Sequence, residues 1–283
     1  MTKISLGTAQ WGLNYGIANS TGIPSLNDIN DLICYARRNK ICMLDTANTY
    51  GEVESKLGKI GIDDFDTVTK VSVSKGQSAK IENLIKTSSL NMKLNSIYGC
   101  LVHNPQELLK DSKIWEALKK EKERGIISKI GYSVYEPDVL NRLLDKNMFP
   151  DIVQLPYSIL DRKFERAINF LKHEKVEIHV RSVFLQGLYF LELNKLPVAL
   201  KPLKKPLKKI NSICKVNSFS MLELCLSFVL KNNNIDFAVM GVENLEQLVQ
   251  INDFFHKSKK LKIVDDCTLD FSFDQKLLNP TNW

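Results

Sequence analysis

The chain has 283 residues and a mass of 32.3 kDa, with 44% hydrophobic and 25% charged residues. This length supports a large hydrophobic core, and the composition excludes a fibrous or intrinsically disordered chain. No apolar run approaches the roughly 18 residues that a membrane span needs, and the first residues, MTKISLGTAQ, lack the apolar region of a signal peptide. We therefore expect a cytoplasmic protein without membrane contact.

Cysteine content and charge exclude further classes of protein. The six cysteines form no CxxC pair, so the sequence indicates neither a zinc site nor a disulfide framework. The formal net charge of +7 is well mixed along the chain, except that seven lysines and no acid fall between Glu192 and Glu223. Because this lysine-rich segment, residues 195–215, has no aromatic residues and lies in no recognised binding module, we expect no nucleic-acid partner.

Strand candidates recur about every 30 residues as short runs rich in apolar and β-branched residues. They lie at residues 4–8, 42–45, 67–73, 96–103, 129–133, 152–156, 177–183 and 236–240. Segments with helical periodicity fill the gaps, at residues 25–39, 52–60, 78–93, 111–124, 137–146, 162–174, 219–231 and 244–256. Ser25, Asp111 and Asn244 stand at the start of three of these segments and are typical helix-capping residues.

Eight strand–helix cycles in one chain of this length predict an α/β fold, a closed parallel (β/α)8 TIM barrel, rather than an open sheet with a second domain. No Gly/Ser-rich linker divides the chain, so we expect residues 1–283 to form a single domain without an N-terminal hairpin before the first strand. The lysine-rich segment is then an insertion after strand 7. It is either a flap whose charge attracts an anionic ligand, or a solvated loop in which Pro202 and Pro206 prevent a helix.

Chemistry in such a barrel lies where the strands end. The predicted strand ends carry Gly7, Thr8, Asp45, Lys70, His103, Asn104, Ser133, Gln154, Arg181, Ser182 and Gly241. Asp45, Lys70 and His103 come from consecutive strands, and Tyr50 lies in the loop after Asp45. Barrel closure is therefore expected to bring these four side chains within reach of one another.

A phenol with an ordinary pKa of about 10 donates a proton poorly at neutral pH unless a cation stabilises its anion. We expect Lys70 to supply that cation to Tyr50, and Asp45 to keep the ammonium group charged and oriented. His103 can orient a carbonyl oxygen through a ring N–H. These groups can protonate a carbonyl oxygen while hydride reaches the carbon, and because side chains cannot supply hydride, a nicotinamide cofactor is required.

Each residue has a simpler interpretation when it is taken alone. An aspartate at a strand end is more often a cap or a surface residue, and His103 after CLV is more often a core histidine. Lys70 is harder to explain, because an inward ammonium group in the strand VTKVSV needs a partner. A non-enzymatic alternative is a regulatory barrel that binds the nicotinamide cofactor as a redox sensor or channel-type accessory subunit. All four candidate catalytic residues are present at the same barrel mouth, and this favours an enzyme over the regulatory alternative.

The motifs LGTAQWG, LDTANTYG, VTKV, CLVHNP, IGYSVYEP, DIVQLPYS, RSVFLQGL and VMGVENLEQL follow one another along nearly the whole chain. In this order they make the sequence resemble the aldo-keto reductases. The resemblance implies Tyr50 as the general acid/base, Lys70 and Asp45 as the pair that tunes it, and His103 as the group that orients the carbonyl. It also implies a metal-independent carbonyl reduction that depends on NADPH or NADH.

Cofactor-binding positions follow from the same resemblance. It implies contacts from Gly7, Thr8, Ser133, Gln154, Arg181, Ser182, Gly187, Gly241, Val242, Glu243, Asn244 and Gln247. Backbone N–H groups where the last strand meets its helix are suited to the cofactor phosphates. Ser133 and Gln154 match the pair that binds the carboxamide.

Four positions depart from the family pattern. Val134 stands where an asparagine is usual, and Arg181 where an aromatic residue commonly stacks on the nicotinamide; a guanidinium plane can stack too, but its charge would disfavour the oxidised ring. Glu243 and Gln247 stand where members that prefer NADPH usually have cationic or hydroxyl residues. Because an acid repels a 2′-phosphate and can accept hydrogen bonds from a free ribose hydroxyl, we predict a weaker NADPH preference than usual, with comparable use of NADH.

The segment after the first strand, WGLNYGIANSTGIPS, offers polar side chains at the barrel mouth. We expect substrate contacts from Trp11, Asn14, Tyr15 and Asn104, and a hydroxylated, sugar-like aldehyde or ketone as the substrate; equally, the glycines and proline of this segment could only shape a loop. Its length, the missing hairpin and the closing LLNPTNW resemble a bacterial subgroup found with surface-polysaccharide and nucleotide-sugar pathways. We expect a monomer or weak homodimer whose partners are the cofactor and a small carbonyl substrate.

Overall fold

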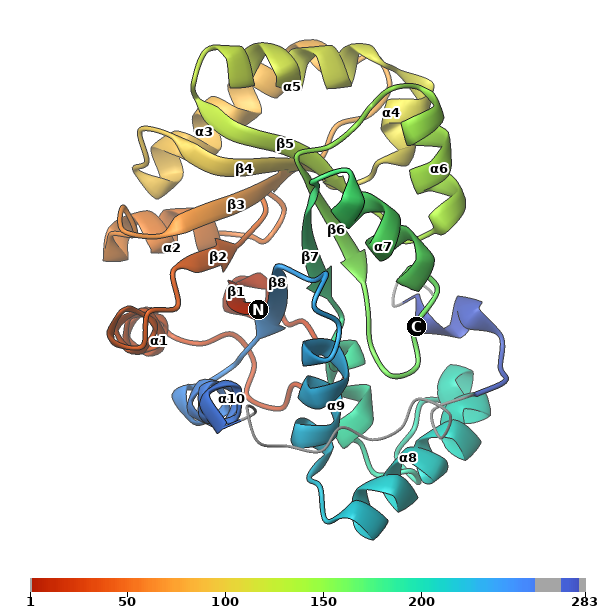
Figure 1. Cartoon of the computed structure of the whole chain (residues 1–283). Coiled ribbons are helices and arrows are strands. Elements are labelled where there is room, and N and C mark those ends of the chain that lie inside the picture. The colour runs from red at the N-terminus through yellow and green to blue at the C-terminus, as the bar shows by residue number, and fades with distance from the viewer. Residues whose placement is uncertain (1, 258–270, 280–283) are drawn as a thin grey trace.

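Eight parallel strands hydrogen-bond to one another in chain order and close into a barrel in which β1 pairs with β8 (Figure 1). The computed structural model describes residues 2–257 and 271–279. The strands are β1 Lys3–Gly7, β2 Met43–Asp45, β3 Asp66–Val71, β4 Ile97–Val102, β5 Ile127–Ser133, β6 Ile152–Pro156, β7 Glu177–Arg181 and β8 Phe237–Gly241. Each overlaps a predicted strand, so the predicted (β/α)8 barrel is confirmed.

The helices lie in the predicted gaps between the strands. They are α1 Leu26–Arg38, α2 Val53–Ile60, α3 Ile81–Met92, α5 Lys113–Glu123, α6 Pro137–Asp145, α7 Glu165–His173, α9 Met221–Leu230 and α10 Leu245–Lys257. Ser25 caps α1, because its Oγ accepts the N–H of Asp28 at 3.2 Å. The 3-10 helix η2 Ser78–Lys80 lies at the start of the helix predicted at residues 78–93. The sequence did not predict the short elements α4 Gln106–Lys110, η1 Ala9–Trp11, η3 Leu185–Phe190 and η7 Gln275–Leu278.

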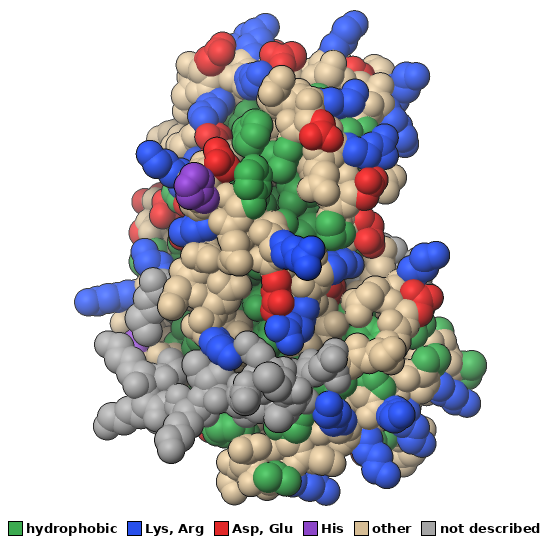
Figure 2. All heavy atoms as spheres, turned by 45° about the vertical axis from the view of Figure 1, so that its right-hand side comes forward, with side chains coloured by type: hydrophobic (Ala, Val, Ile, Leu, Met, Phe, Trp, Pro, Cys, Tyr) green, Lys and Arg blue, Asp and Glu red, His purple; other side chains and the backbone are tan. Residues whose placement is uncertain are grey.

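The lysine-rich segment forms the 3-10 helix η4 Val198–Leu203 and the helix α8 Lys204–Asn217, so the alternative in which Pro202 and Pro206 prevent a helix is wrong. Pro206 is the third residue of α8, and a proline is tolerated in the first turn because N–H groups there have no partner within the helix. Leu207 and Ile210 bury one face of α8, whereas the lysines of the segment are exposed. Basic side chains gather over this part of the surface (Figure 2).

Two apolar clusters hold the barrel together. The smaller one joins residues of four strands: Met43, Val68, Leu101 and Ile152. The larger one connects the strands to the helices that surround them (Figure 1). Gly131 of β5 has to be a glycine, because a Cβ there would lie 1.7 Å from the carbonyl oxygen of Ile152. Within the described ranges, no single helix is long and apolar enough to cross a membrane. Two consecutive helical segments, residues 198–217 and 221–230, reach the required length and hydropathy only when they are counted as one, and they are bent by 95° relative to each other.

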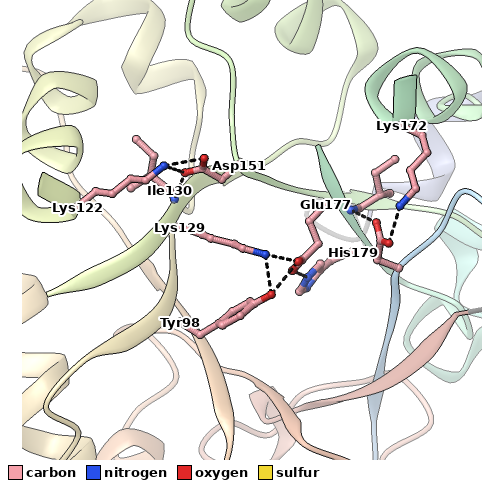
Figure 3. Close-up of polar contacts among 10 residues, drawn as sticks. Tyr98, Lys122, Lys129, Ile130, Asp151, Lys172, Glu177 and His179 are labelled. Carbon is pink, nitrogen blue, oxygen red and sulfur yellow. Dashed lines mark hydrogen bonds and ion pairs between the residues drawn. The ribbon is translucent and has the colours of Figure 1, made fainter. Parts of the chain in front are cut away.

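Three groups of hydrogen-bonded polar side chains lie at the end of the barrel where the strands begin (Figure 3). We call them together the base cluster: Tyr98, Lys122, Lys129, Asp151, Lys172, Glu177, His179 and Asp236. Asp151 binds Nζ of Lys122 at 2.6 Å and accepts a backbone N–H of β5 at 2.9 Å. Asp236 repeats the arrangement, with Nζ of Lys172 at 2.6 Å and a backbone N–H of β7 at 2.9 Å. Each acid thus ties a helix lysine to a strand.

Glu177 is the centre of the base cluster (Figure 3). Its Oε2 pairs with Lys129 and accepts the hydroxyl of Tyr98 at 2.7 Å, and its Oε1 lies 2.7 Å from Nε2 of the fully buried His179. Burial alone would raise the pKa of Glu177, but the hydrogen bonds from His179 and Lys129 outweigh it and lower the pKa to about 2. Glu177 therefore stays ionised in the folded protein at any ordinary pH.

Candidate active site

A pocket of about 400 Å³ lies at the carboxyl ends of the strands. The loops after β1 and β7 and the start of α10 complete its wall. Its lining includes twelve of the residues that the sequence predicted for the site: Gly7, Thr8, Tyr15, Asp45, Tyr50, Gln154, Arg181, Ser182, Gly187, Gly241, Glu243 and Gln247. The barrel therefore brings catalytic and cofactor candidates into one cavity.

A buried ion pair lies under the pocket. Nζ of Lys70 donates to Oδ1 of Asp45 at 2.6 Å and to the carbonyl of Thr46 at 2.9 Å, and the Lys70 side chain is only 1% exposed. Nε2 of Gln154 donates to the other oxygen of Asp45 at 2.6 Å. Ser133 in turn lies 3.3 Å from Oε1 of Gln154. Strands β2, β3, β5 and β6 thus share one hydrogen-bonded chain.

Tyr50 sits at the turn after β2, above this ion pair. The chain folds back here closely against Gly12, where a Cβ would lie 1.9 Å from the carbonyl oxygen of Tyr50. Gly51 follows with φ +62, a conformation that favours glycine. Nζ of Lys70 lies 5.2 Å from the centre of the Tyr50 ring. The ammonium group of Lys70 therefore lies close to the phenol, over the face of its ring.

The expected acidification of the phenol is wrong for this arrangement. Burial and the nearby Asp45 carboxylate raise the pKa of Tyr50 well above its ordinary value. Burial is the larger of these two causes, and the ammonium group of Lys70 donates to Asp45 and Thr46. Tyr50 is accordingly protonated at neutral pH, the state that a proton donor requires.

His103 lies beside Tyr50, with the two rings edge to face and their centres 5.9 Å apart. Burial and the charge of Lys70 lower the pKa of His103 to about 4, so the imidazole is neutral at pH 7. Nδ1 lies 3.3 Å from the hydroxyl of Thr49. When that hydroxyl donates to Nδ1, the ring proton resides on Nε2 and is available to an oxygen acceptor.

Arg181 is fixed at the end of β7 by four contacts. Its guanidinium carbon lies 3.7 Å from the centre of the Tyr135 ring. It donates from Nε to the hydroxyl of Ser133 at 3.2 Å, from Nη2 to the carbonyl of Val134 at 3.0 Å, and from Nη1 to the hydroxyl of Ser182 at 3.3 Å. The arginine therefore reaches across to the end of β5, beside the position where the family usually has an asparagine.

The start of α10 forms another wall of the pocket. The N–H of Glu243 donates to Oε1 of Gln247 at 2.8 Å, and Oε2 of Glu243 lies 3.5 Å from the hydroxyl of Thr21. Burial raises the pKa of Glu243. Asn244 caps the helix, since its Oδ1 accepts the N–H of Gln247 at 3.0 Å. Glu243 and Gln247 line the pocket, whereas Asn244 does not.

The predicted substrate contact of Trp11 is wrong. The side chain is fully buried, and its indole N–H donates to the carbonyl of Val242 at 2.9 Å. Trp11 therefore braces the loop after β1 against the connection between β8 and α10. Val242 is also fully buried and lies outside the pocket lining, so the cofactor contact predicted for this segment could come only from its backbone.

The other predicted substrate residues differ in position. Tyr15 lines the pocket, and its hydroxyl accepts the side-chain N–H of Gln186 at 3.0 Å. Asn14 is exposed and lies outside the lining. Asn104 is also exposed, and its Oδ1 accepts the N–H of Gln106 at 3.3 Å at the start of α4. The loop after β1 thus contributes one of its three predicted contacts.

The structure adds residues that the sequence did not identify. Tyr135 supports the guanidinium of Arg181, and η3 brings Gln186 to the pocket wall. Gln186 and Gly187 have φ of +54 and +88, which turns this loop toward the loop after β1. Gly187 is the sequence feature that could have indicated this close approach of the two loops, because a Cβ at position 187 would lie 2.4 Å from the Cβ of Ala18.

Comparison with known proteins agrees with this geometry. Residues 3–268 match the family model described as Aldo/keto reductase family. No curated protein matches the sequence. The holo form of aldo-keto reductase AKR11C1 from Bacillus halodurans is 20% identical, with a TM-score of 0.75 over 97% of this chain and 91% of that one. A thermostable aldo-keto reductase, Tm1743, solved with the inhibitor epalrestat, is 20% identical, with a TM-score of 0.70 over 99% and 94%. Likeness at this identity shows a shared fold.

Proposed function

We propose that this chain, which belongs to the Aldo/keto reductase family and is therefore an NAD(P)H-dependent oxidoreductase, reduces the carbonyl of a hydroxylated, sugar-like aldehyde or ketone with Tyr50 as the proton donor. The buried ion pair of Asp45 and Lys70 beside the Tyr50 ring carries this proposal. A fully buried lysine is tolerated only with a partner, and this pair lies directly under a protonated phenol that lines the pocket.

The four side chains have separate roles in the proposed reaction. A bound reduced nicotinamide supplies hydride to the carbonyl carbon. The Tyr50 hydroxyl gives its proton to the carbonyl oxygen, and the positive charge of Lys70 stabilises the phenolate that remains. Asp45 keeps Lys70 charged and in place. His103, neutral at pH 7, donates from Nε2 to the same oxygen and orients it.

The pocket wall fits a dinucleotide. Gly7 and Gly241 are register partners on β1 and β8. A Cβ at Gly241 would lie 2.5 Å from side-chain atoms of Gln10, so the glycine leaves room for Gln10, and both residues line the pocket. The start of α10 lies next to it and presents backbone N–H groups to an anion such as a diphosphate. Gln154, which lines the pocket, would hold the carboxamide at the other end, and the buried Ser133 would support it through its hydrogen bond to Oε1 of Gln154.

Glu243 is the basis for the proposed cofactor preference. It lines the pocket beside the hydroxyl of Thr21, and the lining of this wall contains no lysine or arginine among the described residues. A carboxylate repels a 2′-phosphate and accepts hydrogen bonds from a ribose hydroxyl. We therefore expect NADH to serve at least about as well as NADPH.

The polar side chains of the pocket support a hydroxylated substrate. Tyr15, Gln186, Gln250, Ser182 and Gln10 all line the cavity, and neutral amides and hydroxyls bind sugar hydroxyls through paired hydrogen bonds. This composition also supports the likeness to the subgroup found with surface-polysaccharide and nucleotide-sugar pathways. That likeness rests in part on the closing segment, of which residues 280–283 lie outside the described residues.

A substrate screen tests the proposal. The purified protein is incubated with a panel of aldoses, ketoses and nucleotide sugars, with NADH or NADPH, and the loss of reduced-nicotinamide absorbance is followed. We expect turnover of at least one hydroxylated carbonyl compound, and turnover about 1,000-fold slower with the Tyr50→Phe variant. A protein that binds the cofactor but turns over no carbonyl compound would instead support the regulatory barrel.

A further inference from the structure

The charges around the pocket do not balance. Only three charged side chains line it among the described residues: Asp45, Arg181 and Glu243. Asp45 is neutralised by its ion pair with Lys70. Glu243 lies at the start of α10, on the wall where we place the phosphates. The end of the pocket near Tyr50 therefore carries one uncompensated charge, the guanidinium group of Arg181.

Arg181 cannot easily turn away from the pocket. The Tyr135 ring packs against its plane, and the end of β5 holds two of its three nitrogens. Three of its five N–H groups are used, and none of its hydrogen-bond acceptors is an acid. Its positive charge opposes the rise in the pKa of Tyr50 and contributes to the low pKa of His103. The field of Arg181 thus reaches the reacting end of the pocket.

A nicotinamide ring is neutral when reduced and carries a positive charge when oxidised. We propose that Arg181 makes this pocket select the reduced cofactor over the oxidised one, so that the enzyme acts in the direction of carbonyl reduction and readily releases its oxidised cofactor. The inference rests on the proposed function, because it requires a nicotinamide ring beside Tyr50. Two positive charges within a partly buried pocket repel each other strongly enough to change affinity by about tenfold or more.

Asp161 is an acid whose ionisation responds to Arg181. Burial raises the pKa of Asp161 to about 6, while Lys163 and Arg181 oppose the rise. Nζ of Lys163 lies 3.7 Å from its Oδ2, and no ion pair joins Asp161 to Arg181 among the described residues. Asp161 therefore compensates Arg181 only in part, and its removal should strengthen the selection.

Calorimetric titration of the purified protein with NADH, NAD+ and ADP-ribose tests the proposal without any turnover. The native protein should bind NADH about tenfold or more tightly than NAD+. Arg181→Met, which keeps the bulk and removes the charge, should reduce this ratio about tenfold, mainly through tighter binding of NAD+. Arg181→Lys keeps the charge and should retain most of the ratio. ADP-ribose lacks the ring, so its affinity should be the same for all three proteins.

Two further variants serve as controls. Arg142→Met removes an exposed surface charge that lies 3.7 Å from Asp138, and it should leave every affinity unchanged. Asp161→Asn should weaken NAD+ more than NADH at pH 8. An unchanged NADH to NAD+ ratio in folded Arg181→Met, or equal changes in the Met and Lys variants, would overturn the charge effect while the proposed function stands. Failure of the native protein to bind either nucleotide would overturn both.

Discussion

The two ends of the barrel use the same kinds of side chain in different ways. At the base, Lys122, Lys129 and Lys172 each pair with an acid, in part-buried positions near solvent (Figure 3). At the mouth, Lys70 and Asp45 are paired under almost complete burial, and Arg181 has hydrogen-bond partners but no ion pair with an acid in the part of the chain that the structure describes. Ion pairing therefore stabilises the end of the barrel that holds the base cluster, whereas the mouth leaves the charge of Arg181 and the proton of Tyr50 available to a ligand.

Removal of the Tyr50 hydroxyl should change activity more than any other substitution, and it affects only the mouth of the barrel. Tyr50→Phe keeps the ring that packs beside Lys70 and removes the hydroxyl. We expect kcat to fall about 1,000-fold, within the range for loss of a general acid, while the melting temperature and the affinity for NADH stay the same. Steady-state kinetics and calorimetry measure the three quantities. Native-like turnover by this variant would refute the role of Tyr50.

Lys70→Met tests how costly a broken pair is at the mouth. The change leaves the Asp45 carboxylate 4% exposed and without its cation. We expect the free energy of unfolding to fall by about 3–5 kcal/mol, measured by urea denaturation at pH 7. The double variant Asp45→Asn/Lys70→Met should recover much of this loss, because it removes the unpaired charge. Equal stability of the single and double variants would contradict this account.

Glu177→Gln tests the contribution of the base cluster to stability. The pKa of Glu177 is lowered from an ordinary 4.5 to about 2, so its ionisation stabilises the fold above pH 4.5, and this stability is lost as the pH falls from 4.5 to 2. We expect the variant to be less stable than the native protein by up to about 3 kcal/mol at pH 7, with a difference that shrinks toward pH 2. Urea denaturation across this range measures it.

The same variant sharpens the contrast between the two ends. Because the base cluster lies at the opposite end of the strands from the pocket, kcat of Glu177→Gln at 25 °C should stay within about twofold of native. A loss of kcat comparable to that of a mouth variant would show that the two ends are coupled.

The smallest effect is expected at the start of α10. Glu243→Gln removes the carboxylate from the pocket wall and keeps the side-chain size. We expect kcat/KM with NADPH to rise about tenfold relative to NADH, because repulsion of the 2′-phosphate is removed. Thermal stability should not change. A native enzyme that already prefers NADPH a hundredfold would contradict the assignment of Glu243.

Local signals predicted the strands and most helices well, because each is specified within its own segment. The capping pattern at Ser25 and the apolar run CMLD need no distant partner to be read. Local signals were misleading for residues 195–215. Pro202 and Pro206 suggested a loop, whereas the burial of Leu207 and Ile210 stabilises a helix. That burial depends on neighbouring elements and is not visible in the segment itself.

The order of residues alone was sufficient to predict the barrel, the single mouth, and the presence of Asp45, Tyr50, Lys70 and His103 around it, because closure of eight cycles places the strand ends together. It was not sufficient to show the direction or pairing of a side chain. The indole of Trp11 turns into the core and donates to the carbonyl of Val242, Lys70 donates to Asp45 and Thr46, and burial keeps the phenol of Tyr50 protonated. Such choices depend on which groups are left without water or a partner once distant strands meet, and only the tertiary structure brings those groups together.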